Sequence, residues 1–282
     1  MADLFVKVHD LDPRFLDVPG IYQSKGGGFR VPFNAFGLLG WKLPAHFEDS
    51  LGQKALDSAL RSGILRPDTL SRMRPHQQKC LVPALARIGF HIWAPPGSGK
   101  TLMGLVYHAW DTRPSGPRLV ITKAAARSTW QEEAERWTTF QTVLLVGQDP
   151  SKILDETFPR ADTLYITAWE TLIYWRDALV KARPSSLVMD EIHVAKANRR
   201  VKPIVQPDGT TEWESLDNLT AAARAIAGVS SRRLGLTATP IPNKVRDLWA
   251  QLDLGEPWQY GPFSKFGVAY CDGHHNGYGM EY

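Results

Sequence analysis

The sequence predicts an α/β fold, in which a doubly wound and mainly parallel sheet follows a small N-terminal α+β appendage. Two observations support this prediction. From about residue 89, short apolar runs alternate with amphipathic helical patterns, the order expected of repeated strand–helix units. Several of these runs are apolar almost throughout (LVIT, VLLV, LYIT and LVMD), as in strands that helices cover on both faces.

The predicted elements follow one another in order along the chain. Strands are expected at residues 89–94, 118–122, 143–147, 163–168, 186–191 and 232–239. Helices between them are expected at residues 101–110, 126–137, 216–227 and 244–252. An inserted hairpin is expected at residues 199–215, which we interpret as a surface loop rather than a functional element. Because ligands of such sheets bind at the carboxyl ends of the strands, we expect the chemistry there.

Residues 1–70 have a different pattern and are predicted to be a small accessory module with a boundary near residues 66–68. Two short strand-like runs flank the glycine-rich residues 25–28, which predicts a β-hairpin. A helix is expected at residues 49–62. The remaining residues, 71–282, are expected to form the main lobe.

Composition and charge leave the chemistry open. With 43% hydrophobic and 22% charged residues, the chain has the composition of an ordinary globular protein. It has no apolar run of about 20 residues, the length that crosses a bilayer, and no secretory signal pattern at its first residues. Its two cysteines are far apart in sequence, which indicates a reducing compartment, the cytoplasm or the nucleus. The net charge of +4 is compatible with a nucleic-acid partner and equally with a solvated basic surface.

The strongest chemical signal is the segment 94–101, with the sequence APPGSGKT. It follows a predicted strand and opens a predicted helix, which is the context that a phosphate-binding loop requires, although Ala94 replaces the usual first glycine. Its glycines let backbone N–H groups turn inward, and the helix adds its positive N-terminal end. Lys100 is expected to reach the β- and γ-phosphates and Thr101 to ligate Mg²⁺. The other residues expected to surround the phosphates are Pro96, Gly97, Ser98 and Gly99.

A pair of carboxylates, Asp190 and Glu191, ends the apolar run at residues 187–189. Alone, such a pair is commonly a helix cap or a surface feature. Downstream of a phosphate-binding loop, it predicts that Asp190 holds Mg²⁺ and that Glu191 orients and deprotonates an attacking water. Together with Lys100, these two residues form the predicted catalytic set of an ATP hydrolase.

Several motifs resemble those of the superfamily 2 DEAD/DEAH helicases, and more narrowly those of the N-terminal RecA-like lobe of Swi/Snf-type ATPases. Residues 190–193 form a DExH box, and residues 74–77 (RPHQ) resemble the adenine-reading glutamine motif. Residues 166–172 (ITAWETL) and 234–243 (LGLTATPIPN) are similar to the Swi/Snf segments ITSYETL and LTGTPIQN. The tail at residues 266–279 looks most like the annealing-helicase, or fork-remodelling, branch.

The resemblance implies a role for each matching residue. Gln77 would read the adenine, with Arg74 near the nucleotide, and the alternative is that Gln77 is an ordinary exposed helix residue. The residues that would couple hydrolysis to lobe movement are His193, Thr237 and Thr239. For the two threonines, the alternative is that their hydroxyls cap the next turn. The residues in segments that contact a nucleic-acid backbone in related motors are Thr122, Lys123 and Thr167.

The function that the resemblance implies is that of an ATP-binding lobe, with Mg²⁺ as cofactor, in a motor on single-stranded, double-stranded or forked DNA. A second RecA-like lobe does not fit after residue 282 and would come from a longer protein or another chain. Because that lobe would supply arginines to the phosphates, we expect this lobe alone to hydrolyse ATP weakly. Residues 1–70 are a candidate DNA-binding accessory. The alternatives are a DEAH-type RNA helicase, a restriction-type translocase subunit, or a non-hydrolysing, nucleotide-gated DNA-binding switch.

Overall fold

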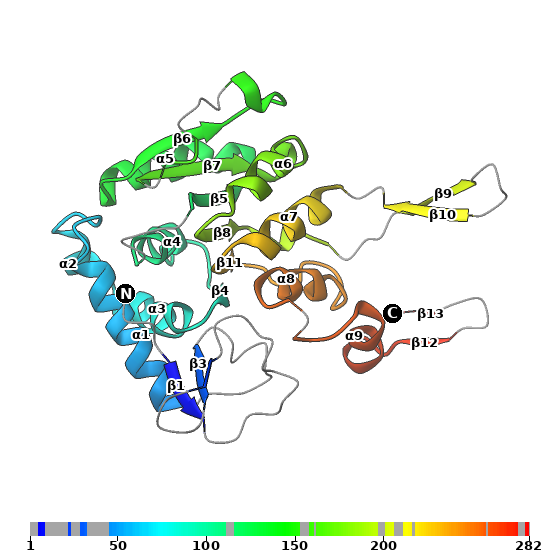
Figure 1. Ribbon diagram of the computed structural model, residues 1–282, viewed down its shortest axis with the longest axis horizontal. Coiled ribbons are helices and arrows are strands. Elements are labelled where there is room, and N and C mark those ends of the chain that lie inside the picture. Colours follow the sequence, from blue (N-terminus) through cyan, green and yellow to red (C-terminus); the bar gives the residue numbers. More distant parts are fainter. Residues whose placement is uncertain are drawn as a thin grey trace.

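The centre of the chain is a six-stranded sheet in the order β4-β11-β8-β5-β7-β6, and every neighbouring pair in it is parallel (Figure 1). The predicted doubly wound sheet is therefore confirmed. Its strands are β4 (Gly89–Trp93), β5 (Arg118–Thr122), β6 (Gln141–Leu145), β7 (Thr163–Ala168), β8 (Ser186–Asp190) and β11 (Arg233–Thr237). The computed structural model describes residues 5–8, 22–23, 29–32, 45–110, 116–152, 158–160, 162–196, 201–205, 211–215, 218–257, 259–275 and 280–281.

All six strands occur where the sequence predicts them, with small differences at their ends. The largest shift is in β6, which begins at Gln141 and ends at Leu145, two residues before the expected bounds. Beyond it, Val146 is exposed and Gly147 has a φ of 77°, in the left-handed region. An extended strand cannot continue through that conformation, so the chain turns away from the sheet there.

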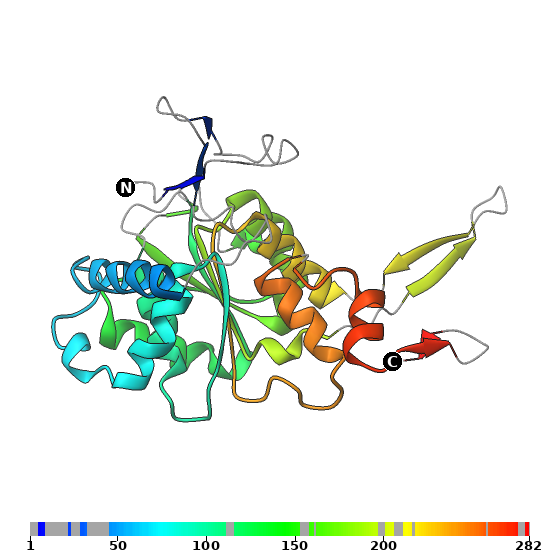
Figure 2. The same ribbon diagram turned by 90° about the horizontal axis from the view of Figure 1, so that it is seen from below.

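Two layers of helices cover the sheet, one on each face (Figure 2). The first layer contains α1 (Ala45–Leu60), α3 (Pro75–Ala86), α4 (Lys100–Ala109) and α5 (Arg127–Trp137). The second contains α6 (Leu172–Ala182), α7 (Asn218–Val229) and α8 (Asp247–Gly255). Along β5, Val120 packs against the first layer, whereas Leu119 and Ile121 pack against the second. Burial on both faces explains why the strand is apolar throughout.

The boundary predicted near residues 66–68 does not separate two packing units. Helix α1 lies beside α3 and contributes buried side chains to the core of the first layer. These side chains are Ala55, Leu56 and Ala59. The two helices approach so closely that a side chain at Gly52 would collide with the carbonyl of Val82. The packing therefore places α1 with the lobe rather than with a separate module.

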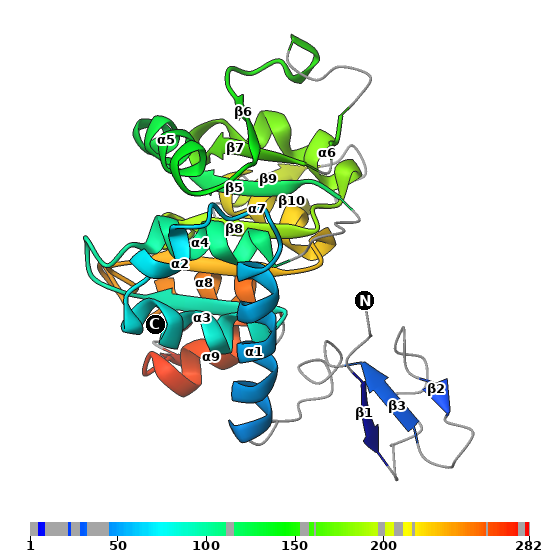
Figure 3. The same cartoon turned by 90° about the vertical axis from the view of Figure 1, so that its left-hand side faces the viewer.

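The described strands of the N-terminal module form their own antiparallel sheet in the order β1-β3-β2 (Figure 3). They are β1 (Phe5–Val8), β2 (Tyr22–Gln23) and β3 (Phe29–Pro32). The pairing of β2 with β3 is that of the predicted hairpin, whose turn at residues 25–28 lies outside the described residues.

The inserted hairpin is also present, as an antiparallel pair of β9 (Val201–Val205) and β10 (Thr211–Ser215) that projects from the lobe (Figure 1). The remaining elements are α2 (Thr69–Arg72), α9 (Phe263–Tyr270), β12 (His274–His275) and β13 (Met280–Glu281). Within the described ranges, none of the helices has the length and apolarity required to cross a bilayer.

Candidate functional site

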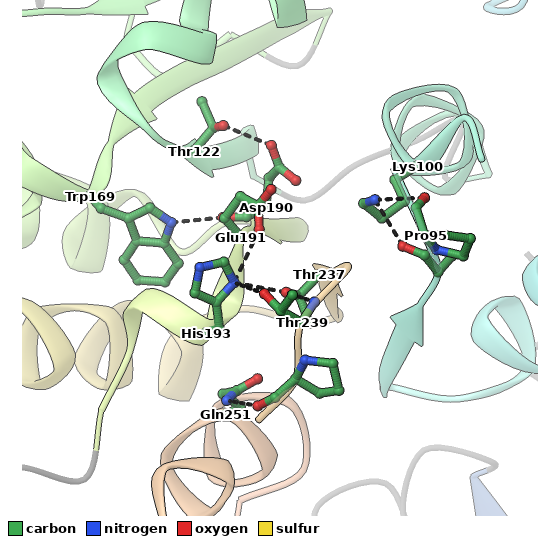
Figure 4. A network of polar contacts seen from close by, with 12 residues as sticks. Pro95, Lys100, Thr122, Trp169, Asp190, Glu191, His193, Thr237, Thr239 and Gln251 are labelled. Carbon is green, nitrogen blue, oxygen red and sulfur yellow. Dashed lines mark hydrogen bonds and ion pairs between the residues drawn. The ribbon is translucent and has the colours of Figure 1, made fainter. Parts of the chain in front are cut away.

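The predicted chemical segments meet at one edge of the sheet, where β4, β11 and β8 end (Figure 4). Strand β11 lies between the other two, and the three strands are parallel. The phosphate-binding loop follows β4, the carboxylate pair ends β8, and Thr237 ends β11. The backbone N–H of Ala94 donates to the carbonyl of Thr237 at 3.1 Å, which fixes the start of the loop against β11.

The phosphate-binding loop has the backbone geometry that its sequence predicts. Gly97 and Gly99 have φ angles of 76° and 80°, which glycine adopts without strain. Gly99 is the N-cap of α4, so the positive end of that helix faces the loop. Lys100 donates from Nζ to the carbonyl oxygens of Ala94 (2.9 Å) and Pro95 (3.2 Å), so its ammonium lies against the loop (Figure 4).

The side chains of the loop also fit a phosphate group. Ser98 Oγ is buried and has no hydrogen-bond partner among the described residues, so a donor is left unsatisfied inside the loop. Pro96 is exposed, and Thr101 is half-buried in the first turn of α4. A cation, a helix N-terminus and an unsatisfied hydroxyl are the groups that bind phosphate oxygens.

Gln77 lies in α3 and is buried, with 5% of its surface exposed. The alternative, that it is an ordinary exposed helix residue, is therefore wrong. Its Nε2 donates to the Ser98 carbonyl at 3.0 Å, and its Oε1 accepts from the Arg74 backbone N–H at 2.8 Å. A side chain at Gly99 would collide with this amide. Gln77 therefore joins the N-terminus of α3 to the phosphate loop. His76 supports the same connection, since its Nε2 lies 3.1 Å from the Ser98 carbonyl oxygen. Its contact with adenine stays a prediction.

Asp190 is held by donors from three other segments. Its Oδ2 accepts from Thr122 Oγ1 at 2.8 Å and from the indole Nε1 of Trp130 at 2.9 Å. Its main-chain oxygen accepts from Nε1 of Trp169 at 2.7 Å. Because both side-chain bonds end on Oδ2, the carboxylate has a fixed orientation and can present Oδ1 to a hard cation, which prefers oxygen ligands.

Two of the three residues predicted to lie in nucleic-acid-contacting segments have buried side chains, and the contact of their segments stays a prediction. Thr122 is 0% exposed, and its hydroxyl is the one that donates to Asp190. Thr167 is also 0% exposed, and its hydroxyl has no partner among the described residues. Both lie in strands that helices cover on both faces, which leaves neither hydroxyl at the surface. Lys123 is exposed, and its contact with a nucleic acid stays a prediction.

Glu191 follows β8 in the left-handed backbone conformation, with φ of 51° and ψ of 45°. For a residue other than glycine this costs about 1–3 kcal/mol, and such strain gathers at functional sites. Its Oε2 lies 3.1 Å from Nδ1 of His193. The same nitrogen lies 2.8 Å from Thr237 Oγ1 and 3.5 Å from Thr239 Oγ1. One ring nitrogen is thus shared between the carboxylate and the two threonines that end β11.

The surroundings of His193 favour its neutral form, because they lower its pKa. Burial lowers its pKa, an effect that the Glu191 carboxylate partly offsets and that Lys123 and Lys196 reinforce. A neutral imidazole carries one N–H and one acceptor nitrogen, so Nδ1 makes one full hydrogen bond at a time. The contact with Glu191 and the contact with Thr237 therefore compete.

Some residues of the site were not predicted to belong to it. Trp130 and Trp169 look like packing side chains, and Gln251 is a single polar residue inside α8. In the structure Gln251 is 0% exposed and donates from Nε2 to the Pro240 carbonyl at 2.7 Å (Figure 4). It thereby holds the loop that follows Thr239. The one hint in the sequence is that Gln251 stands among the apolar residues of a helix that is expected to pack on the sheet.

A comparison with protein families identifies the lobe. Residues 70–242, more than half of the 282-residue chain, match the family model described as type III restriction enzyme, res subunit. This chain belongs to that family. In this member of the res-subunit family, the matched span begins in α2 and includes the phosphate loop, the DExH box, Thr237 and Thr239.

Several curated relatives and one solved structure that match this chain are described as Swi/Snf proteins. A Caenorhabditis elegans homolog of SWI/SNF-related matrix-associated actin-dependent regulator of chromatin subfamily A-like protein 1 is 22% identical over 86% of this chain and 31% of its own length. The human subfamily A member 1 is 27% identical over 56% of this chain and 14% of its own length. The Sulfolobus solfataricus SWI2/SNF2 ATPase core in complex with dsDNA has a TM-score of 0.56 and 24% identity, and the match covers 71% of this chain and 39% of that one.

The prediction of a superfamily 2, Swi/Snf-type RecA-like lobe is confirmed by these matches. The chain spans less than a third of the length of the two curated relatives named above.

Proposed function

We propose that this chain is the ATP-binding lobe of a motor that hydrolyses Mg-ATP and moves along double-stranded DNA. One observation carries the proposal, the arrangement of groups where β4, β8 and β11 end. A phosphate loop with its lysine lies at the same edge as a fixed carboxylate, a second carboxylate in strained backbone, and a histidine between that carboxylate and Thr237.

Each group has a task in hydrolysis. Lys100 and the N–H groups of the loop bind the phosphate oxygens, while Thr101 and Asp190 would hold Mg²⁺. When bound, Mg²⁺ neutralises charge on the transferred phosphoryl group. Glu191 takes a proton from a water whose oxygen attacks the γ-phosphorus in line, and the bond from phosphorus to the ADP oxygen breaks.

His193 connects this reaction to β11. A proton that arrives on Glu191 neutralises the carboxylate and weakens its attraction for Nδ1, which lies 3.1 Å away. The ring then keeps its contact with Thr237, and the hydrogen-bond pattern at the end of β11 changes with each hydrolysed ATP. Gln251 and Pro240 carry this change into the loop before α8.

Double-stranded DNA is proposed as the track because the Sulfolobus core that this chain resembles is described as a complex with dsDNA. Lys123, which is exposed next to the site, is the candidate contact with a phosphate backbone. Binding through such contacts is largely independent of sequence and weakens as salt rises. A second RecA-like lobe, in the rest of the protein or on another chain, is proposed to complete the site.

A restriction-type translocase subunit is the second candidate, and the description of the matching family favours it. It shares the ATP chemistry and the DNA track and differs in the partner subunits. An RNA track, a fork-remodelling activity and a switch that binds ATP without hydrolysis are alternatives that the experiment below separates. A location in the nucleus or the cytoplasm stays a prediction.

The test is ATP hydrolysis by this chain with double-stranded, single-stranded and forked DNA and with RNA, each compared with Glu191→Gln. We expect a low basal turnover that double-stranded or forked DNA raises, and a loss of about 100-fold or more in the variant, the usual worth of a general base. Stimulation by RNA alone would favour the RNA helicase. Binding of ATP with equal lifetimes in both proteins would favour the switch.

A further inference from the structure

The position of Asp190 depends on two buried tryptophans. Trp130 donates to the carboxylate and Trp169 to the main-chain oxygen of the same residue, at 2.9 Å and 2.7 Å. Each indole is 1% exposed. Figure 4 shows Thr122 at the carboxylate of Asp190 and Trp169 at its main chain. The bond from Trp130 ends on a carboxylate, and hydrogen bonds to an ionised acceptor are about twice as strong as neutral ones, so it orients the side chain of Asp190. The bond from Trp169 holds the main chain of the same residue.

Trp130 also contacts the helix that carries the phosphate-binding residues. Its ring packs so closely on α4 that a side chain at Gly104 would collide with it. One indole therefore touches both halves of the site, the helix that begins with Lys100 and the carboxylate at the end of β8. A displacement of α5 of a few tenths of an ångström would change both contacts, because packed interiors transmit strain.

The two tryptophans come from segments whose outer surface is free. Trp130 lies in the first turns of α5, after the short helix η3 (Ala124–Ala126), and Trp169 opens the short helix η5 (Trp169–Thr171). The two short helices are joined by a hydrogen bond from the Ala124 backbone N–H to Glu170 Oε2 at 3.1 Å. The exposed residues on this outer surface are Lys123, Ala124, Ala125, Ser128, Thr129 and Glu170.

We propose that Trp130 and Trp169 are positioning residues that link a nucleic-acid backbone bound on the outer surface of η3 and η5 to the metal-holding carboxylate of Asp190. This rests on the proposed function of the site. A strand that binds to η3 and η5 orders the two segments, and the indoles beneath them set the orientation of Asp190. By reciprocity, Mg-nucleotide at Asp190 raises the affinity of the same surface for the strand.

The experiment measures binding of a fluorescent ATP analogue by the whole chain as Mg²⁺ is titrated, with and without double-stranded DNA. In the parent chain we expect DNA to tighten Mg-dependent binding at least about fivefold, the lower end of ordinary coupling between sites. Trp130→Phe and Trp169→Phe keep an aromatic ring and lose the N–H. Trp130→Phe is expected to weaken Mg-dependent binding about tenfold, as loss of a hydrogen bond to a charged group does. Trp169→Phe loses a bond to a neutral carbonyl and is expected to weaken it about threefold. In both variants the ratio of the affinities with and without DNA should fall towards one.

The chain contains matched controls. Trp137 is in the same helix as Trp130 and donates to Glu133 Oε2, and Trp175 donates to the Gly147 carbonyl. Trp137→Phe and Trp175→Phe also remove an indole N–H, but one that does not contact Asp190. In these two variants we expect DNA to tighten Mg-dependent binding as much as in the parent. In the absence of Mg²⁺ all four variants are expected to bind the analogue as the parent does, which a general loss of structure would not allow. If Trp130→Phe does not fold, Thr122→Val removes the other donor to Oδ2 and is expected to act in the same way.

The outcomes separate this proposal from the function on which it rests. A parent chain that binds no Mg-nucleotide would overturn the proposed function itself. A parent that binds it, with DNA coupling retained in Trp130→Phe, Trp169→Phe and Thr122→Val, would overturn only the positioning role. The same loss in all four Trp→Phe variants, or no effect of DNA on the parent, would overturn it too.

Discussion

His91 and His108 are two buried histidines that the fold keeps neutral. Burial lowers the pKa of His91 to about 4, against a smaller opposing effect of the Leu252 backbone. It lowers the pKa of His108 to about 3, and Arg118 adds to that effect. In an unfolded chain both would titrate near 6.5. The unfolded state therefore binds more protons than the folded state below about pH 6.5, and acid favours unfolding.

The stability of the lobe is expected to fall between pH 7.5 and pH 5. Each of these histidines contributes a loss of roughly 2 kcal/mol over that interval, since one pKa unit corresponds to about 1.4 kcal/mol. His91→Phe keeps a ring of similar shape and removes one titrating group, so its loss of unfolding free energy should be smaller by about 2 kcal/mol. Urea unfolding at the two pH values measures the difference. If the parent and the variant lose the same unfolding free energy, protonation of His91 does not destabilise the folded lobe.

At the scale of single residues, the sequence predicted the groups that belong to a contiguous motif. Lys100, Asp190 and Glu191 lie at the edge of the sheet where the spacing of glycines and carboxylates placed them. Trp130 could not be recognised in the same way, because an indole N–H has no sequence signal until its acceptor is known. That acceptor, Asp190, lies 60 residues further along the chain, at the end of β8. The bond from Thr122 to Asp190 could not be predicted for the same reason, since this partner is set by the order of the strands.

At the scale of elements, the contact of α1 with α3 decides which helices belong to the lobe. The contact depends on Gly52, where the Val82 carbonyl occupies the space of a side chain. A second helical glycine, Gly228 in α7, has open space at the same position. The sequence gives no sign of this difference, because it shows two glycines inside two helical patterns and not what packs on them.

The same substitution is therefore expected to have opposite effects at the two glycines. Gly52→Ala should destabilise the lobe by about 1–3 kcal/mol, because the new methyl group forces the helices apart. Gly228→Ala should stabilise it by about 0.5 kcal/mol, since alanine loses less backbone entropy in a helix. Thermal unfolding of the two variants beside the parent measures both changes. A neutral Gly52→Ala would mean that α1 is not packed on α3 in solution.

At the scale of the whole molecule, the six strands and most helices of the two layers could be predicted, whereas α3, α6, the strand order and the domain boundary were not. Apolar runs show that a strand is buried and not which strand lies beside it. The boundary was placed at a proline-containing turn near residue 67, but the apolar side chains of α1 are part of the lobe's core. Sequence patterning marks turns, and only packing shows whether the elements on either side share a core.

Two truncations test where the lobe begins. Removal of residues 1–44 is expected to leave the melting temperature of the lobe within a few degrees of the parent's, since α1 and its core contacts remain. Removal of residues 1–66 takes away Leu56 and Ala59, which are 1% and 0% exposed, and should lower the melting temperature by about 10 °C or prevent folding. Calorimetry on the three chains gives the comparison. If both truncations melt alike, the boundary does lie near residue 67.

Strand β11 is the last strand of the six along the chain, yet it lies between β4 and β8. During synthesis, the segments that bear Lys100 and Asp190 leave the ribosome well before the strand that joins them, so the early sheet has a gap between its edge strand β4 and β8. The insertion of β11 closes that gap through contacts far apart in sequence, which form slowly. The nucleotide site is therefore among the last features of the lobe to form during folding. ATP, by binding only the closed sheet, stabilises a chain that has completed this step over one that has not.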